Sequence, residues 1–151
     1  MELKFAFTPR VKGLRQLEFA TRRLREARTI IQTNPDLIPP TLEKYSYHLN
    51  ILFDKNFKNE EVLAQVNKDL ITHLEVLQQI YNESSDIRAK MAIRSTINRI
   101  IIRANISYKD KLPVCTFFAK EASAAALNQT EKFVIQDRAQ RCFDSLGKSN
   151  S

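Results

Sequence analysis

Two cysteines are the residues of this sequence whose type and spacing allow a covalent cross-link. We expect a turn at residues 127–129, with Cys115 about twelve residues before it and Cys142 about thirteen after it. At about 1.5 Å of rise per residue, both lie about 18–20 Å from the turn, level with each other in an antiparallel helical hairpin. Such a hairpin permits the Cα separation of about 5.5 Å that a disulfide requires. Two reduced, buried cysteines would have the same spacing, so the spacing alone leaves both alternatives open.

The sequence lacks the patterns that are typical of a zinc site or of a catalytic cysteine. A zinc site would need the cysteines together with His48 and His73, but the sequence has no Cys-x-x-Cys motif and no closely spaced histidines. A catalytic thiol would need a nearby base, and neither cysteine has a histidine close in sequence. We therefore expect no metal, no cofactor and no catalytic residue, and we predict that the chain is not an enzyme. Each histidine is expected on a helix face or at a helix interface.

Basic residues gather in two segments of a chain whose net charge is +7. Residues 10–28 hold seven Arg or Lys and two Glu, and residues 88–103 hold five Arg or Lys and no acidic residue. Together they could form a patch for nucleic acid, an anionic lipid surface or an acidic protein. The alternative is a solvated surface, partly neutralised by acidic residues of neighbouring helices such as Glu61. The candidate basic patch comprises Arg15, Arg22, Arg23, Arg25, Arg28, Arg88, Lys90, Arg94, Arg99 and Arg103.

Helices are the elements that must position these residues. The chain has 151 residues and only two glycines, whereas sheet proteins use glycine in hairpin turns and bulges. Apolar residues repeat at steps of three and four, the pattern of helices with one buried face. The sequence predicts an all-α fold, a single-domain bundle of five to six helices ending in an antiparallel helical hairpin. The clearest apolar series is Leu63, Val66, Leu70, Leu74, Leu77 and Tyr81.

Proline and capping residues mark the expected starts of helices. Pro9 is expected at the first position of the first helix, where its missing N–H costs nothing. Pro113 is expected inside the first turn of the fifth helix, after a loop at residues 108–112. Asn128 and Glu131 have the spacing of a capping box and predict the start of the sixth helix.

The residues near the two termini are informative about the bounds of the domain and about the cellular compartment of the protein. Gly147 is expected to end the last helix, which predicts one domain over residues 1–147 and a disordered tail over 148–151. Residues 1–10 lack the order of charged, apolar and small residues of a signal peptide. No apolar run approaches the roughly 20 residues that span a bilayer. The chain is thus expected to be a cytoplasmic protein, or an extracytoplasmic domain whose N-terminal anchor has been removed.

A family resemblance appears in the first third of the chain. The segment 5–9, Phe-Ala-Phe-Thr-Pro, is followed by residues 17–27, Leu-Glu-Phe-Ala-Thr-Arg-Arg-Leu-Arg-Glu-Ala. This layout, with Tyr45 in the second helix, resembles the signature of the bacterial domain of unknown function 5667. The resemblance implies an extracytoplasmic helical domain that follows a signal or membrane anchor and has no assigned catalytic residue. In an oxidising compartment, the bridge between Cys115 and Cys142 becomes the favoured alternative.

Two functional hypotheses follow. The first is a non-enzymatic extracytoplasmic interaction or sensor domain of a membrane-anchored or secreted bacterial protein, with an unidentified protein partner. The second is a cytoplasmic nucleic-acid-binding or transcription-regulating bundle that uses the basic first and fourth helices. Steep salt dependence of nucleic-acid binding would distinguish the second from the first.

Overall fold

A computed structural model of the chain describes residues 9–54, 60–104, 108–123 and 128–149. The described residues form helices and no strand, which confirms the predicted all-α fold. None of these helices is long and apolar enough to cross a membrane. The elements are α2 (Pro9–Ile30), the short 3-10 helix η1 (Pro35–Leu37), α3 (Ile38–Asp54), α4 (Glu60–Glu83), α5 (Ile87–Arg103), α6 (Tyr108–Ala122) and α7 (Gln129–Ser149).

Contacts between the helices divide the chain into two compact units, Met1–Ala104 and Asn105–Ser151. The first unit contains α2 to α5, and the second contains α6 and α7. That residues 1–147 form one domain stays a prediction.

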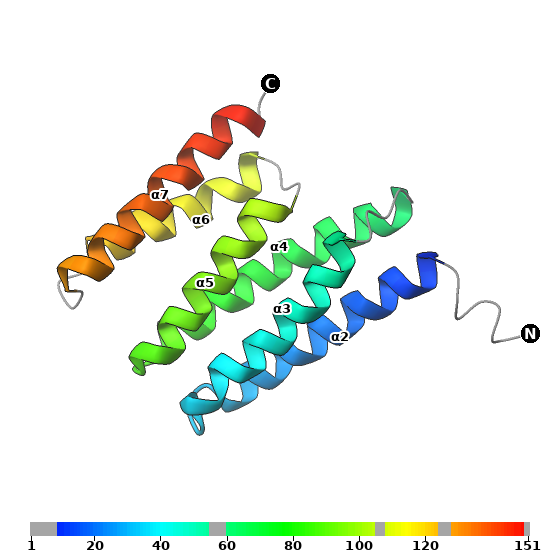
Figure 1. Cartoon of the computed structure of the whole chain (residues 1–151), viewed down its shortest axis with the longest axis horizontal. Coiled ribbons are helices and arrows are strands. Elements are labelled where there is room, and N and C mark those ends of the chain that lie inside the picture. Colours follow the sequence, from blue (N-terminus) through cyan, green and yellow to red (C-terminus); the bar gives the residue numbers. More distant parts are fainter. Residues whose placement is uncertain (1–8, 55–59, 105–107, 124–127, 150–151) are drawn as a thin grey trace, which may run out of the picture. The chain divides into compact units, whose positions relative to one another are not determined.

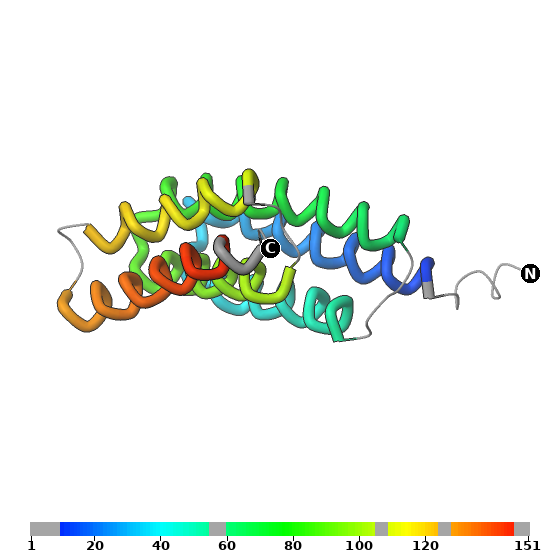
Figure 2. The backbone as a smooth tube through the Cα atoms, turned by 90° about the horizontal axis from the view of Figure 1, so that it is seen from above, coloured from blue at the N-terminus to red at the C-terminus, as the bar shows by residue number. Residues whose placement is uncertain are grey.

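The first unit is a four-helix bundle in two layers. Helices α3 and α5 lie in front of α2 and α4 in Figure 1, and the view from above in Figure 2 separates the same two layers. Helix α2 packs on α3 and α4, and α5 also packs on α3 and α4. Helices α2 and α5 therefore occupy opposite corners of the bundle.

The apolar series predicted on α4 faces the core in all but one of its residues. Leu70 and Leu77 of this series are completely buried, as are Ile38 on α3 and Ile97 on α5. Burying each such side chain contributes about 1.5–3 kcal/mol relative to leaving it in water. Leu63 is the exception, because it is 44% exposed while its neighbour Val62 is 1% exposed. Val62 lies in the three-and-four series that continues through α4, and Leu63 lies about 100° away around the helix.

The second unit is an antiparallel hairpin in which α6 and α7 run side by side (Figure 1). Phe118 on α6 and Ile135 on α7 are buried together with the two cysteines. The predicted pair of capping residues meets at the start of α7, but its second bond comes from the Asn128 side chain and not from the Asn128 backbone N–H of a capping box. The backbone N–H of Glu131 donates to Asn128 Oδ1 over 2.8 Å, and Asn128 Nδ2 donates to Glu131 Oε1 over 2.8 Å.

Two predicted helix boundaries in this unit are wrong. Helix α6 begins at Tyr108, so residues 108–112 are helical and Pro113 lies inside the helix. Proline removes one helical hydrogen bond at a cost of about 3 kcal/mol. The burial of Val114 and Phe118 on the same helix offsets that cost. Helix α7 continues to Ser149, so Gly147 does not end it. Of the expected tail, residues 150–151 lie outside the described residues.

Candidate functional site

The two cysteines are brought together by α6 and α7, as the spacing predicted. Their Sγ atoms lie 2.11 Å apart, at the distance of a disulfide, and their Cα atoms lie 5.3 Å apart. Cys115 is fully buried, and Cys142 is 3% exposed. The cross-link therefore lies inside the hairpin and ties residues that are 27 positions apart in the sequence.

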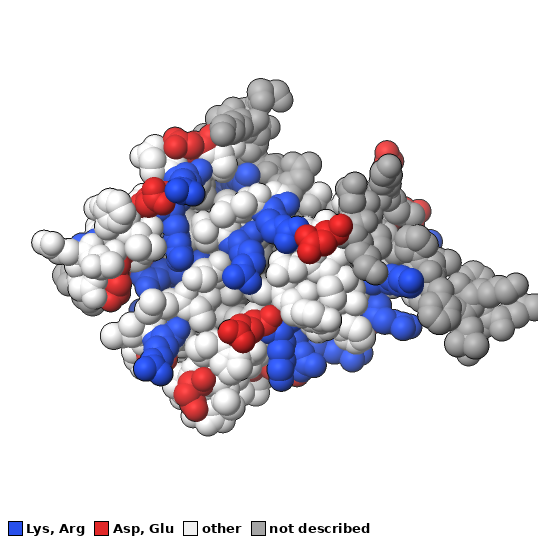
Figure 3. Space-filling view, in the orientation of Figure 1, with Lys and Arg blue, Asp and Glu red and all other residues white. Residues whose placement is uncertain are grey.

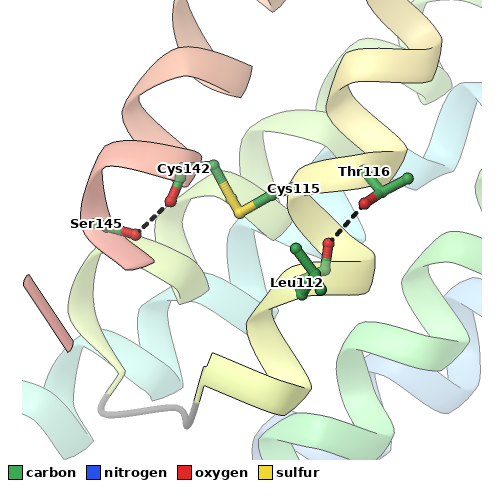
Figure 4. Close-up of a disulfide and its surroundings, with 5 residues drawn as sticks. All are labelled: Leu112, Cys115, Thr116, Cys142 and Ser145. Atoms are coloured by element: carbon green, nitrogen blue, oxygen red, sulfur yellow. Dashed lines mark hydrogen bonds between the residues drawn. A yellow bond between two sulfur atoms is a disulfide. The ribbon is translucent and has the colours of Figure 1, made fainter. Parts of the chain in front are cut away.

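The hydroxyl groups next to the cysteine pair bond to their own helices. Figure 4 shows Thr116 Oγ1 donating to the carbonyl of Leu112 over 2.9 Å, and Ser145 Oγ donating to the carbonyl of Cys142 over 2.6 Å. These bonds place both hydroxyl groups against the backbone. In the described part of the chain, no group of three or more His, Cys, Asp or Glu side chains is arranged to hold a metal ion.

A buried hydrogen-bond chain through His73 connects three helices of the first unit. The side chain of His73 on α4 is 3% exposed. Its Nδ1 lies 2.8 Å from the hydroxyl of Tyr45 on α3, and its Nε2 lies 3.0 Å from Oγ1 of Thr21 on α2. Thr21 Oγ1 also lies 2.8 Å from the carbonyl oxygen of Leu17, to which its hydroxyl donates.

The donors and acceptors in these hydrogen bonds can be assigned from the groups at the two ends of the series. The hydroxyl of Thr21 donates its only proton to the Leu17 carbonyl, so the hydroxyl oxygen must accept a hydrogen bond from His73 Nε2–H. His73 Nδ1 is then an acceptor, and the Tyr45 hydroxyl donates to it. The arrangement fits a neutral imidazole and has no place for a second ring proton. Burial accordingly lowers the pKa of His73 to about 4, and burial raises the pKa of Tyr45.

His48 lies on α3 near the surface and makes different contacts. Its Nδ1 is 2.8 Å from Gln16 Oε1, and its ring packs against Phe19 with centroids 5.2 Å apart. Burial, and then the positive charge of Arg23, lowers its pKa. Both histidines thus lie at helix interfaces.

The arginines of α2 face solvent, and several are paired with acidic residues of the same helix. Arg22 pairs with Glu18 over 2.6 Å, and Arg23 pairs with Glu26 over 2.7 Å. An acidic residue of a neighbouring helix also neutralises part of the charge of α2, as predicted. Glu61 on α4 pairs with Arg10 on α2 over 3.1 Å. On α2, the exposed arginines without an ion pair among the described residues are Arg15, Arg25 and Arg28.

The basic residues of α5 fall into three environments. Arg103 pairs with Asp54 and donates to Asn50 Oδ1 over 3.1 Å. Arg88 and Arg99 are exposed. Arg94 and Lys90 instead lie against the ring of a buried tyrosine in α4, Tyr81, and Arg94 itself is 4% exposed.

The candidate basic patch is therefore divided. Its α2 and α5 members lie at opposite corners of the four-helix bundle, and Arg94 does not reach the surface. On the face drawn in Figure 3, Lys and Arg side chains are interleaved with Asp and Glu. One feature of the sequence is consistent with the burial of Arg94. Arg94 lies seven residues, about two turns, before the buried Ile101 and therefore on the same face of α5.

Three exposed apolar side chains, which we call the stripe, lie on one face of α5, two near the start of the helix and one near its end. Ile87 is 64% exposed, Met91 is 47% exposed and Ile102 is 67% exposed. Steps of four and eleven residues place all three within about 60° of one another around the helix. Arg88 and Arg99 lie beside this stripe, on the side away from Arg94.

Comparison with known proteins adds no relative, since no family model, curated protein or solved structure matches the chain. The resemblance of its first third to the domain of unknown function 5667 stays a prediction.

Proposed function

We propose that this chain is a non-enzymatic interaction or sensor domain of an extracytoplasmic bacterial protein, either membrane-anchored or secreted. The observation that carries the proposal is the buried pair Cys115 and Cys142, whose sulfur atoms lie at disulfide distance. Disulfides persist in oxidising compartments and are rare in the reducing cytosol. A cross-link at the centre of a two-helix hairpin also suits a small unit with a limited core of its own.

The exposed stripe on α5 supports the interaction role. Monomeric proteins expose single apolar residues freely, but a series on one helix face flanked by arginine is typical of a protein-binding surface. The stripe from Ile87 to Ile102 spans about 22 Å, enough for about four turns of a partner helix. Because α5 carries no acidic residue, we propose a partner segment that is apolar on one face and bordered by Asp or Glu.

Site-specific photo-crosslinking in the native host tests this role. A photoreactive residue at position 91 should crosslink to one partner, and the same residue at the exposed position Gln79 on α4 should not. With the purified partner, Ile102→Asp should weaken binding about tenfold or more, since a charge replaces a buried apolar contact. The matched control is Phe133→Asp on α7, where the native side chain is 72% exposed. Equal loss in both variants, or equal crosslinking from positions 91 and 79, would contradict the proposed surface.

The second candidate function is nucleic-acid binding, and the exposed arginines of α2 favour it. Arg15, Arg25 and Arg28 are available to contact phosphate groups. A binder that uses such contacts loses affinity steeply with salt, because each neutralised phosphate releases counterions. Fluorescence anisotropy of labelled DNA and RNA between about 50 and 200 mM salt would show that slope. An absence of binding at the lowest salt concentration would exclude this candidate.

A further inference from the structure

The side chain of Arg94 is a buried cation, and two of its three nitrogen atoms lack a hydrogen-bond partner in the described part of the chain. It is 4% exposed, and its Nε and Nη1 atoms have no partner among the described residues. A guanidinium is a delocalised cation with five N–H donors and no acceptor. Buried charges in folded proteins are almost always paired and hydrogen-bonded, because an isolated one is costly. Arg94 therefore lies in an environment that is electrostatically incomplete.

Lys90 lies against the same tyrosine ring as Arg94 and adds a second positive charge. Lys90 Nζ lies 4.8 Å from the centroid of the Tyr81 ring, and Arg94 Cζ lies 5.9 Å from the same centroid. The two residues are one helical turn apart on α5, so their side chains are neighbours. The π-face of Tyr81 attracts both cations, but a cation–π contact contributes only about 0.5–2 kcal/mol and satisfies no N–H group. Residues 87–103 of α5 contain no carboxylate, and the carboxylate of the N-cap Asp86, four residues before Lys90, accepts the backbone N–H of Ala89.

We propose that Arg94 and Lys90 form a binding site for a small dianionic oxyanion of the inorganic phosphate type. Such an anion accepts charge-assisted hydrogen bonds from the guanidinium and from the ammonium group, and its charge balances both. Lys90 is half-buried, so it connects the buried arginine with the surface of α5. The paired cations favour phosphate or sulfate over a singly charged carboxylate. This site lies beside the stripe of Ile87, Met91 and Ile102, and phosphate binding to it can be measured without a partner on that stripe.

Thermal unfolding of the intact chain in phosphate tests the site, with chloride holding the ionic strength constant. We expect phosphate to raise the Tm saturably, because an anion that binds only the folded state stabilises it. Arg94→Met should abolish that rise. Methionine has an apolar side chain of similar length, and replacing a buried ion with apolar groups is often tolerated or stabilising. The matched control is Arg99→Met, an exposed arginine of the same helix, which should keep the full rise.

Two further measurements connect the effect to these residues. In NMR spectra of the Arg side chains, the Nε–H resonance of Arg94 should shift saturably with phosphate. Lys90→Met should weaken phosphate binding about tenfold or more, in keeping with the loss of one charged hydrogen bond. Equal phosphate stabilisation of the wild type and Arg94→Met, or no phosphate-dependent shift at Arg94, would overturn the proposal. Equal affinity for acetate and phosphate would overturn the preference for a dianion.

Discussion

Acidification should destabilise the first unit through a single buried imidazole, that of His73. Burial lowers the pKa of His73 to about 4 in the folded chain, against 6.5 for a free histidine. As the pH falls below 6.5, the unfolded chain takes up a proton that the folded chain does not. The stabilising effect of the neutral imidazole is therefore complete above pH 6.5 and is lost progressively as the pH falls to about 4.

The magnitude follows from the size of the pKa difference. Each unit corresponds to 1.36 kcal/mol, so the neutral form of His73 contributes about 3 kcal/mol at pH 7 that is lost near pH 4. The hydrogen bonds of His73 explain why its protonated form is unfavourable in the folded chain. A second ring proton would make Nδ1 a donor, and the buried Tyr45 hydroxyl now donates to that atom. His48, whose pKa is also lowered, acts in the same direction and must be separated from His73.

Urea unfolding followed by circular dichroism at several pH values between 7 and 4.5 measures the effect. The reference is His73→Gln, whose amide can accept and donate without titrating. The free energy of unfolding of the wild type should fall more steeply than that of the variant, and the difference between the two curves isolates His73 from His48 and the carboxylates. Equal slopes would refute the reasoning. So would an NMR titration in which His73 of the folded wild type takes up its proton near pH 6.5, a readout that does not depend on the variant.

Three further changes have expected outcomes. Reduction of the bond between Cys115 and Cys142 should destabilise the hairpin by about 3.5 kcal/mol in the chain-entropy model. Thermal melts with and without reductant would show this, and identical melts would contradict it. Tyr45→Phe leaves the acceptor nitrogen of His73 unsatisfied and should cost about 1–3 kcal/mol in urea unfolding. A cost near zero would mean that the hydroxyl is not the donor. Asp86→Ala removes the N-cap of α5, where the carboxylate accepts a backbone N–H, and should cost about 1 kcal/mol by the same assay.

The periodicity of apolar residues was sufficient to predict the helices and most of their buried faces. Residues three and four apart share a face of a helix, so a spacing of this kind also specifies which side must be buried. It could not choose between Val62 and Leu63, since both are apolar neighbours and only packing decides which one faces the core. The start of α6 was also unpredictable from Pro113 alone, because tertiary packing offset the lost hydrogen bond.

The buried polar features depend on distances between helices, which local sequence does not contain. Thr21, Tyr45 and His73 lie on three different helices, and each looks ordinary on its own. The register of Arg94 with Ile101 hints that Arg94 is buried, but the local sequence does not show that Tyr81 of α4 lies against it. The cysteine pairing was accessible because its geometry needs only the helical rise and one turn.

The oxidation state of the cysteines in the native cell tests the proposed compartment most directly. Cells would be lysed under denaturing conditions with an alkylating reagent and no reductant, and the chain would be analysed by mass spectrometry. We predict that Cys115 and Cys142 stay unmodified until a reductant is added, and then react together. Alkylation of both cysteines before reduction would contradict the account of a cross-linked domain outside the cytoplasm.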